Sequence, residues 1–351
     1  MEGEFDESPR EGNPVRILVL GGTRFIGRHL VSAALERGHE VTLFNRGRSS
    51  TGLFPDVPRL VGDRDTDLDA LRQGHWDATV DLSGYEPQQV RAVGEALGAR
   101  AGRYVLFSST AVYAPPQGYG FQEDAAVVRA ADPAGAGADY GELKALCETA
   151  AAEVFGNPLV VRPTYVVGPY DYTGRFTYWV ERIAAGGEVL APGPREAFFQ
   201  LIDVRDLTAW LVTMIERRAA GTYQAAHPFP PVAFVGLLET IAAAVAPPDT
   251  TLTWVDQEFA EACGMDGEAL PLWPGANPPG VVEAADASRA VAAGLRPRPL
   301  EETVRDLLDH ERREPTPRDP GAGITRAVEA DVLARWHARA VGEDGARVSQ
   351  G

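Results

Sequence analysis

Two side chains four residues apart could together move a proton. Tyr140 and Lys144 stand in the segment YGELK, at the start of a stretch whose apolar spacing predicts a helix over residues 140–155. Residues at this spacing share one face of a helix, so the Lys144 ammonium could favour the phenolate form of Tyr140. A free phenol has a pKa of about 10, and about 4 kcal/mol of preferential phenolate stabilisation would bring it to about 7. The pair is a candidate acid–base catalyst, although an exposed helix pair without a function would show the same spacing.

A serine stands where it could act with this pair. The segment RYVLFSS predicts a strand over residues 103–109, and ligands bind at the carboxyl ends of the strands of a parallel sheet. The Ser109 hydroxyl could therefore donate a hydrogen bond to a substrate carbonyl, while Tyr140 transfers the proton and a nicotinamide carries the hydride. The simpler alternative is a serine that caps the turn after the strand.

A glycine-rich turn could hold that nicotinamide dinucleotide. Gly21, Gly22 and Gly27 stand between an apolar run that predicts a buried strand over residues 15–20 and the helical pattern RHLVSAALERG. Gly21 permits a tight turn and Gly27 lets the helix approach the sheet, so the positive end of the helix can face a pyrophosphate. A plain strand-to-helix turn is the alternative, but strand, glycines and helix in this order favour dinucleotide binding.

Two arginines bear on the choice of dinucleotide. The next predicted strand ends in Asn45 and Arg46, where an NAD-specific site offers an acidic residue to the ribose 2′-hydroxyl. Arg24 stands in place of the usual middle glycine of the turn. Arg24 and Arg46 could clamp a 2′-phosphate through charge-assisted hydrogen bonds of about 1.5–3 kcal/mol each. We therefore expect NADP as the preferred cofactor and NAD as the alternative, unless both arginines are solvated surface residues.

Alternating strands and helices must position these residues. Apolar runs predict six strands before residue 170, with helical patterns between most of them, which indicates an α/β fold with a doubly wound parallel sheet over residues 15–170. Later segments near residues 198–226 are expected to return to this sheet. The remaining prediction is an acidic disordered tail, a smaller C-terminal α/β substrate lobe, and a C-terminal helix with a tail, over residues 1–14, 171–312 and 313–351.

Composition excludes several other classes of protein. The chain of 351 residues has 33 basic and 50 acidic side chains, a formal charge of −17, which disfavours nucleic acid as a partner. Two cysteines and six scattered histidines argue against a disulfide framework and against a metal site. The acidic start and the absence of a run of about 18 apolar residues predict a cytoplasmic protein that does not enter a membrane.

Together these motifs resemble the extended, atypical short-chain dehydrogenase/reductases of the NAD-dependent epimerase/dehydratase superfamily. Six segments occur in that family's order between residues 15 and 312: GGTRFIG, GDR, FSSTAVY, YGELK, VRPTYVVGP and IDVRDL. The resemblance implies a Rossmann fold with Ser109, Tyr140 and Lys144 as the catalytic triad. It also implies that the cofactor contacts Gly21, Thr23, Arg24, Phe25, Ile26, Gly27, Asn45, Arg46, Asp63, Arg64, Leu82, Ser83, Gly84, Tyr140, Lys144, Pro163, Tyr165 and Val166.

The substrate side departs from part of the family. Sugar 4,6-dehydratases carry Thr-Asp-Glu at the serine segment, whereas Ser109-Thr110-Ala111 has no carboxylate, which disfavours elimination of water. After residue 168, Arg175, Tyr178 and Arg182 follow one another at helical spacing, and the arginines could hold a phosphate or carboxylate unless they form a solvated helix face. The expected substrate contacts are Tyr85, Thr110, Tyr113, Arg175 and Tyr178.

The sequence therefore predicts an NAD(P)-dependent enzyme of the reductase or epimerase type. Its substrate would be a small polar molecule, such as a sugar derivative, that carries a carbonyl or a secondary alcohol. The alternative is a non-catalytic protein that senses dinucleotides or binds RNA on the same fold, as chloroplast stem-loop RNA-binding proteins with a similar GGTRFIG turn do. The resemblance also makes a homodimer through the helix of Tyr140 an expectation.

Overall fold

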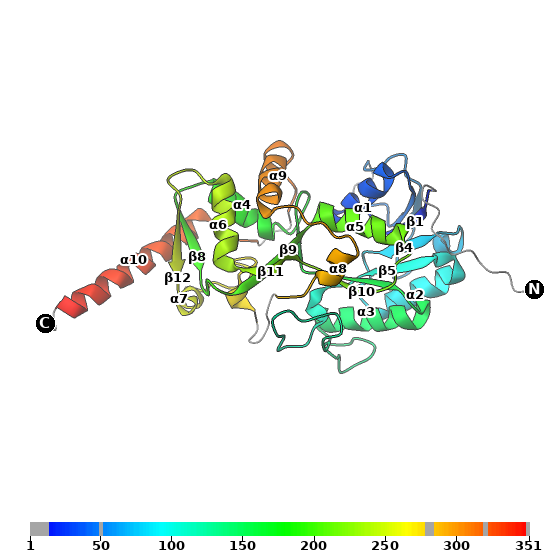
Figure 1. Cartoon of the computed structure of the whole chain (residues 1–351), viewed down its shortest axis with the longest axis horizontal. Helices are drawn as coiled ribbons and strands as arrows, with labels where there is room; N and C mark the ends of the chain where they lie inside the picture. The colour runs from blue at the N-terminus through cyan, green and yellow to red at the C-terminus, as the bar shows by residue number, and fades with distance from the viewer. Residues whose placement is uncertain (1–13, 49–51, 278–283, 319–321, 349–351) are drawn as a thin grey trace, which may run out of the picture.

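A seven-stranded parallel sheet forms one half of the molecule (Figure 1). The computed structural model describes residues 14–48, 52–277, 284–318 and 322–348. The strand order is β10-β6-β5-β4-β1-β2-β3. Strands β2 and β3 are added on one side of β1, and β4 to β10 on the other, so the switch point lies between β1 and β4, where doubly wound sheets bind ligands. The strands are β1 (Arg16–Leu20), β2 (Glu40–Asn45), β3 (Arg59–Val61), β4 (Ala78–Asp81), β5 (Arg103–Phe107), β6 (Leu159–Pro163) and β10 (Gly221–Ala225).

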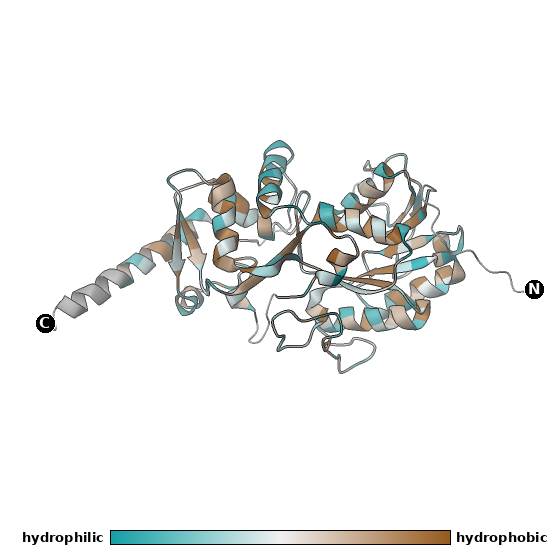
Figure 2. Ribbon diagram, viewed as in Figure 1, coloured by the Kyte–Doolittle hydropathy of each residue, from teal (hydrophilic) through white to brown (hydrophobic). Residues whose placement is uncertain are grey.

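Helices cover both faces of this sheet because its central strands are apolar on both sides. In β1, Ile17 and Val19 pack into one buried cluster, whereas Leu18 and Leu20 pack into another. The first cluster includes α1 (Phe25–Glu36) and α5 (Val204–Glu216), and the second includes α2 (Pro87–Leu97) and α3 (Tyr140–Phe155). Figure 2 shows these helices with both apolar and hydrophilic residues, as expected for helices that cover a core. The prediction of a doubly wound α/β sheet is confirmed.

The other half of the molecule is a smaller α/β lobe. Two short sheets lie there, with strand orders β11-β9-β7 and β12-β8. Its core holds large side chains such as Trp179, Phe199 and Phe234, all of them fully buried. The lobe contains β7 (Tyr165–Val167), β8 (Glu188–Pro192), β9 (Phe198–Asp203), β11 (His227–Ala233), β12 (Thr251–Val255), α4 (Arg175–Ala184), α6 (Phe234–Val245), α7 (Gln257–Ala262) and α9 (Leu300–Arg313).

The structure corrects several predicted elements. The apolar run of residues 158–168, predicted as one strand, is divided at Thr164 into β6 of the large sheet and β7 of the lobe. The apolar spacing of residues 232–246 predicts a helix over that range, but α6 begins at Phe234. The proline-containing residues 227–233 form β11 instead, and its pairing with β9 is irregular. Strands β8 and β9 and helix α7 were not predicted. The helical pattern of residues 285–293 predicts a longer helix than α8 (Ser288–Ala292), which occupies only part of it. The expected N-terminal tail lies outside the described residues apart from Pro14.

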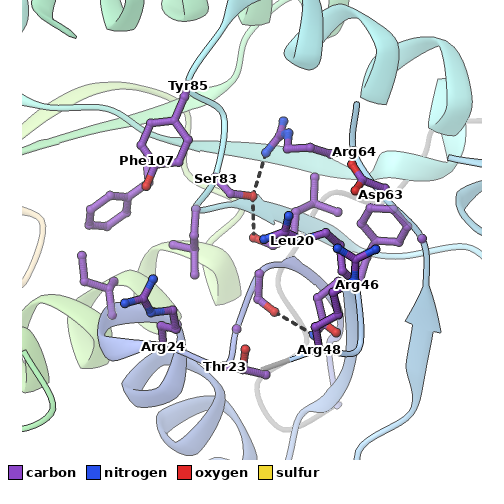
Figure 3. A pocket seen from close by; sticks show the side chains of 18 of the residues that line it. Leu20, Thr23, Arg24, Arg46, Arg48, Asp63, Arg64, Ser83, Tyr85 and Phe107 are labelled. Atoms are coloured by element: carbon purple, nitrogen blue, oxygen red, sulfur yellow. Dashed lines mark hydrogen bonds between the residues drawn. The ribbon is translucent and has the colours of Figure 1, made fainter. Parts of the chain in front are cut away.

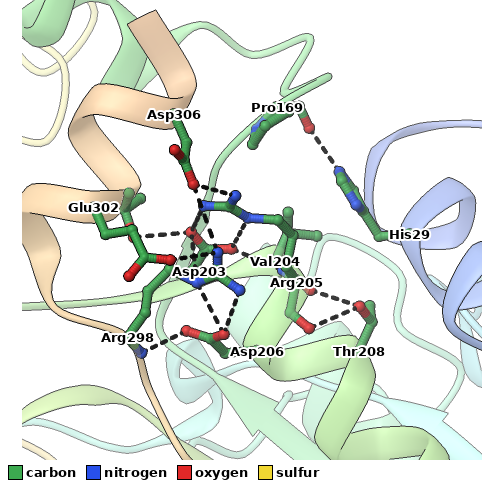
Figure 4. Close-up of polar contacts among 11 residues, drawn as sticks. His29, Pro169, Asp203, Val204, Arg205, Asp206, Thr208, Arg298, Glu302 and Asp306 are labelled. Atoms are coloured by element: carbon green, nitrogen blue, oxygen red, sulfur yellow. Dashed lines mark hydrogen bonds and ion pairs between the residues drawn. The ribbon is translucent and has the colours of Figure 1, made fainter. Parts of the chain in front are cut away.

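A network of ion pairs joins the lobe to the sheet (Figure 4). Asp203, the N-cap of α5, accepts hydrogen bonds from the Arg205 guanidinium and from the Thr303 hydroxyl of α9, at 2.7 and 2.8 Å. Arg205 also contacts Asp306, and Arg298 pairs with Asp206 at 2.8 Å. Burial alone would raise the pKa of Asp203, but the two arginines outweigh it and hold that pKa below its usual value.

The C-terminal helix α10 (Arg326–Val348) is attached to the lobe by a second buried pair. Glu329 lies 2.6 Å from Arg182 of α4 and accepts a hydrogen bond from the backbone N–H of Leu190. Val332 and Leu333 follow on the same helix and are buried in the lobe core. Farther along, α10 extends away from the body of the protein (Figure 1). Within the described residues, no helix is long and apolar enough to span a membrane.

Candidate active site

A cavity of about 430 Å³ opens at the carboxyl ends of β1, β2 and β4, above the glycine turn (Figure 3). Its wall is formed by the turn between β1 and α1, by the end of β2, and by the loops after β3 and β4. Many residues that the sequence assigns to the cofactor lie around it. They are Gly21, Thr23, Arg24, Phe25, Ile26, Gly27, Asn45, Arg46, Asp63, Arg64, Leu82 and Ser83.

The glycines bring the start of α1 against the sheet. Gly21 and Gly22 have φ values of +109° and +88°, which other residues rarely adopt. A side chain on Gly27 would place its Cβ 2.6 Å from the Cα of Gly22, so only glycine permits this approach. No side chain caps the helix at Arg24, and its first turn holds no acidic residue. The positive end of α1 is therefore open to an anion, which fits the pyrophosphate of a dinucleotide.

The arginines are arranged differently from the predicted clamp. Arg46 and Arg48 lie together on one side of the turn, whereas Arg24 lies on the other (Figure 3). The guanidinium carbon of Arg24 is 3.7 Å from the centre of the Tyr172 ring. A cation–π contact thus directs Arg24 toward Tyr172, and the two arginines of the expected clamp line the same cavity from different sides. Arg48 is the neighbour that the sequence analysis missed.

Arg64, assigned to the cofactor, also has a structural contact. Its guanidinium donates to both carboxylate oxygens of Asp81, at 2.9 and 3.0 Å, and to the Ser83 hydroxyl at 2.7 Å. The Tyr104 hydroxyl donates to the same carboxylate at 2.7 Å. Asp81 is completely buried, and although burial raises its pKa, Arg64 and Tyr104 outweigh that effect and lower it. This pair fixes the end of β4 beneath the cavity.

A second cavity, of about 560 Å³, adjoins the first. Six residues line both cavities: Phe25, Ile26, Leu82, Tyr85, Phe107 and Tyr172. Several residues that the sequence assigns to catalysis, cofactor and substrate line the second one, namely Ser109, Thr110, Tyr113, Tyr140, Lys144, Pro163, Tyr165, Val166 and Arg175. The structure thus brings the predicted catalytic residues into one cavity beside the glycine turn.

Tyr140 reaches Ser109 because α3 begins against the turn that follows β5. A side chain on Gly141 would overlap the carbonyl oxygen of Ala111, so glycine allows the two segments to touch. The Asp139 carboxylate accepts a hydrogen bond from the Glu142 N–H at 2.8 Å and fixes the start of the helix. Ser109 also caps its own turn by accepting a hydrogen bond from the Ala111 N–H at 3.1 Å.

The pKa of Tyr140 differs from the predicted pattern. Burial raises this pKa, while a hydrogen bond with Ser109 and the charge of Arg175 lower it, and the net shift is upward. Lys144 is buried and donates to the carbonyl oxygens of Gly84 and Phe107, at 2.9 and 2.6 Å. The prediction named Lys144 as the group that lowers the phenol pKa, but here its ammonium is directed at these two carbonyls, and Ser109 and Arg175 oppose the effect of burial.

The floor of the second cavity is a buried polar network. The Tyr113 hydroxyl accepts a hydrogen bond from Arg162 at 2.8 Å, and burial raises the pKa of Tyr113 to about 12. Arg162 pairs with Glu148 at 2.6 Å, and Glu148 accepts the Ser108 hydroxyl at 2.5 Å. Tyr113 is thus held as a neutral phenol at the wall of the second cavity rather than as a second base.

Not every predicted substrate residue reaches this cavity. Tyr178 packs against residues 323 and 324, where its ring would overlap a Cβ on Gly323, and it lines neither cavity. Arg182 pairs with the Glu329 carboxylate and lines neither cavity, so it does not face a site for a bound anion. Helical spacing was correct for Arg175, Tyr178 and Arg182, but α4 turns only Arg175 toward the cavity and buries the other two against the C-terminal segment.

Other cavity residues carried no signal in the sequence. Asp171, Tyr172 and Thr173 enter the second cavity from the loop between β7 and α4, and Gln117 and Asn277 enter from distant segments. No local periodicity could place them there, because their positions depend on how the lobe packs on the sheet. Among the described residues, no group of three histidine, cysteine or acidic side chains could hold a metal ion.

Comparisons with known proteins agree with this geometry. Residues 17–226, more than half of the chain, match the model of the NAD dependent epimerase/dehydratase family. The chloroplast stem-loop binding protein of 41 kDa b from Arabidopsis thaliana is 31% identical over 222 residues, 58% of this chain and 56% of that protein. The UDP-glucose 4-epimerase of Neisseria meningitidis serogroup C is 27% identical over 173 residues, 40% of this chain and 48% of that enzyme. The chain spans about half the length of these curated relatives.

A solved structure shares the fold. The Bordetella bronchiseptica enzyme WbmH, in complex with NAD+, is similar with a TM-score of 0.65 and 20% sequence identity, over 86% of this chain and all of that one. Sheet order, glycine turn and family match all lead to the same conclusion. The chain belongs to the NAD dependent epimerase/dehydratase family.

Proposed function

We propose that this protein is an NAD(P)-dependent oxidoreductase, of the reductase or epimerase type, that acts on a secondary alcohol or carbonyl. The observation that supports it best is the presence of Ser109, Tyr140 and Lys144 in a cavity that adjoins the glycine turn. A bound dinucleotide would supply the acceptor or donor of a hydride. The residues of the chain then have to bind the substrate oxygen and move its proton.

Proton transfer at the substrate oxygen falls to Tyr140. The Ser109 hydroxyl donates a hydrogen bond to that oxygen, and the Tyr140 hydroxyl gives up or takes the proton as the carbonyl is reduced or the alcohol is oxidised. Because burial raises the pKa of Tyr140, the phenol favours its proton-donating form until a positive charge nearby offsets this shift. Two of the three ammonium N–H groups of Lys144 are donated to the carbonyls of Gly84 and Phe107. The third would donate a hydrogen bond to the dinucleotide.

For the cofactor, we propose NADP ahead of NAD. Arg46 and Arg48 are both exposed and line the first cavity beside Asn45, where the ribose of the adenosine half would lie. Each charge-assisted contact with a 2′-phosphate is worth about 1.5–3 kcal/mol, so one contact favours NADP by roughly 10- to 150-fold. Arg46→Ala should reduce the ratio of NADPH to NADH affinity by that factor. Arg72→Ala removes an exposed arginine that pairs with Asp69 and lines neither cavity, and it should leave the ratio unchanged.

For the substrate, we propose a small polar molecule with one anionic group. The second cavity combines the Arg175 guanidinium with polar side chains such as Thr164, Thr173 and Asn277. Arg175 stands 5.4 Å from the centre of the Tyr165 ring, so its charge is kept at the cavity wall. A sugar derivative bearing a phosphate or carboxylate would match this lining, and the relatives named as UDP-glucose 4-epimerases make sugar nucleotides the first compounds to test.

A single substitution tests the catalytic proposal. Wild-type protein is incubated with NADP or NAD and a panel of sugar nucleotides, sugars and small hydroxy acids, with reduced cofactor followed by absorbance and epimers by NMR. Tyr140→Phe should lower turnover of any active compound about 10²- to 10⁴-fold, with the dissociation constant for the dinucleotide unchanged. Turnover that survives Tyr140→Phe at the wild-type rate would contradict the proposed role.

A second function is favoured by one finding, the 31% identity to a stem-loop binding protein. A protein of that kind would bind RNA and would need no proton donor at Tyr140. Binding of a labelled RNA stem-loop by both the wild type and Tyr140→Phe, without turnover of any compound in the panel, would favour this function over the oxidoreductase. The net charge of −17 opposes it, because a polyanion meets repulsion from such a surface.

A further inference from the structure

The loop between β7 and α4 is attached to the helix that begins at the glycine turn. We call residues 168–174 the strap. His29 donates a hydrogen bond from Nε2 to the Pro169 carbonyl at 2.9 Å (Figure 4). The guanidinium carbon of Arg28 is 3.4 Å from the centre of the Tyr170 ring. The guanidinium carbon of Arg24, the N-cap of α1, is 3.7 Å from the centre of the Tyr172 ring. Pro169, Tyr170 and Tyr172 of the strap are thus all held by residues 24–29, one through a hydrogen bond and two through cation–π contacts.

The strap has a defined shape. Tyr170 has a φ of +67°, a backbone conformation that a residue with a side chain keeps only where its surroundings impose it. The Tyr170 ring lies 4.2 Å from that of His310, and its hydroxyl donates to Glu314 at 3.1 Å. Contacts with α1 on one side and with α9 and its end on the other therefore fix the path of the strap, and with it the place of Tyr172.

Tyr172 stands where the two cavities meet. It lines both of them, as does Tyr85. Burial, and then the Tyr172 phenol, raise the pKa of Tyr85, while Arg24 lowers it, which places these three side chains at one junction. A dinucleotide with its pyrophosphate at α1 and its nicotinamide beside Tyr140 must pass through this junction, next to the Tyr172 ring.

We propose that Tyr172 is a cofactor-contacting residue whose ring, held by Arg24, covers the dinucleotide at the junction and slows its release. This inference rests on the proposed dinucleotide-binding function. Release then requires the ring to separate from Arg24 or to move with the strap. A cofactor that leaves slowly suits an enzyme that oxidises and reduces the same substrate in one cycle, so the strap favours the epimerase type over a reductase that exchanges its cofactor at every turnover.

The experiment measures how fast the reduced cofactor leaves. Protein loaded with NADPH, or in a parallel series with NADH, is mixed in a stopped-flow instrument with excess oxidised dinucleotide, and the loss of nicotinamide fluorescence gives the release rate. Losing one cation–π pair should speed release by about 2- to 30-fold in Tyr172→Ala. Tyr172→Phe keeps the aromatic face and should release at nearly the wild-type rate.

Two further variants make the result specific. Tyr119→Ala removes an exposed tyrosine that lines neither cavity, and it should release cofactor like the wild type. Arg24→Ala should also speed release, and adding Tyr172→Ala to it should have a smaller effect than in the wild type, because the two changes break the same pair. Thermal melts of each variant report whether it is folded. If Tyr172→Ala unfolds, Tyr172→Leu replaces it in the release experiment, because leucine keeps the bulk of the side chain without the aromatic face.

The outcomes separate this inference from the proposed function. Faster release in Tyr172→Ala and Tyr172→Leu, but not in Tyr172→Phe, supports it. Folded Tyr172→Ala that binds cofactor and releases it at the wild-type rate overturns the role of Tyr172 while leaving the dinucleotide site intact. A wild-type protein that binds neither NADPH nor NADH overturns both proposals together.

Discussion

Buried ion pairs in the seven-stranded sheet join residues that are near in sequence, whereas those of the lobe join residues that are far apart. Arg64 and Asp81 are 17 residues apart, and Glu148 and Arg162 are 14 apart. In the lobe, Arg182 and Glu329 are separated by 147 residues, and at its junction with the sheet, Arg298 and Asp206 are separated by 92. Each pair of the sheet spans neighbouring elements of one repeating unit. The lobe instead depends on its last segments to complete contacts that begin with α4 and α5.

The two halves are therefore stabilised by different interactions. The sheet buries alternate faces of continuous apolar strands, so each strand added extends two hydrophobic layers at once. The lobe has two short sheets and a more irregular order of elements, and it attaches α10 to α4 through a pair of charged side chains, Arg182 and Glu329, that is almost completely buried. A buried charge is costly without its partner, so removing one partner should damage the lobe more than a comparable change on the surface of the sheet.

The largest effect is expected from Glu329→Gln. The substitution leaves the Arg182 guanidinium buried without its counter-charge, and we expect a loss of about 3–5 kcal/mol in the free energy of unfolding. Urea denaturation followed by tryptophan fluorescence measures it, with Trp179 of the lobe core as a reporter. A loss in the free energy of unfolding below about 1 kcal/mol, the value of an exposed ion pair, would mean that the lobe does not depend on this buried pair.

A smaller effect is expected from Asp203→Asn, because Arg205 and Arg298 retain Asp306 and Asp206 as partners. At pH 7 we expect a loss of about 1.5–3 kcal/mol, the value of hydrogen bonds to a buried charge. Since the folded-state pKa of Asp203 is lowered, its stabilisation is complete above the unfolded pKa and is lost as the pH falls through the folded value.

The difference between wild type and Asp203→Asn should therefore shrink as unfolding is measured at pH 7, 5, 4 and 3. Asp331→Asn, an exposed acid on α10, provides the matched control and should stay within about 0.5 kcal/mol of wild type at pH 7. A difference that grows toward low pH would mean that the carboxylate does not stabilise the junction.

The smallest effect is expected from Arg91→Ala, which tests a pair on the outside of the sheet. Arg91 of α2 is 2.7 Å from Glu153 of α3, but the two side chains are 41% and 55% exposed, so solvent screens their attraction. We expect a loss of about 0.2–1 kcal/mol that 0.5 M salt largely abolishes. A loss as large as that of Glu329→Gln would show that burial does not set the strength of these pairs.

Sequence reasoning worked best where structure is local. Strand, glycines and helix around Gly21 and Gly27 follow one another without interruption, and the apolar spacing over residues 140–155 predicted the bounds of α3. The run of residues 158–168 misled the prediction, because continuous apolar residues carry no mark of the point where a chain leaves one sheet for another.

The site was predictable to the same extent as the elements that carry it. Tyr140 and Ser109 occupy one cavity, as their motifs implied, because each stands at the end of a regular element. Neither alternative for Arg182, an anion-binding residue or part of a solvated helix face, foresees its pairing with Glu329, which lies too far along the chain to be linked to it by any pattern. Tyr172 could not be found either, because the strap has no periodicity and its place depends on three contacts with α1.

The position of Glu329 has a consequence for the newly made chain. The last strand of the large sheet, β10, is complete at Ala225, roughly a hundred residues before Glu329 leaves the ribosome. The half that contains the seven-stranded sheet can therefore fold while synthesis continues, whereas α4 waits for the C-terminal helix with the Arg182 guanidinium unmatched. A nascent chain stopped just before residue 326 should carry a finished sheet beside a lobe that is open to proteases and chaperones.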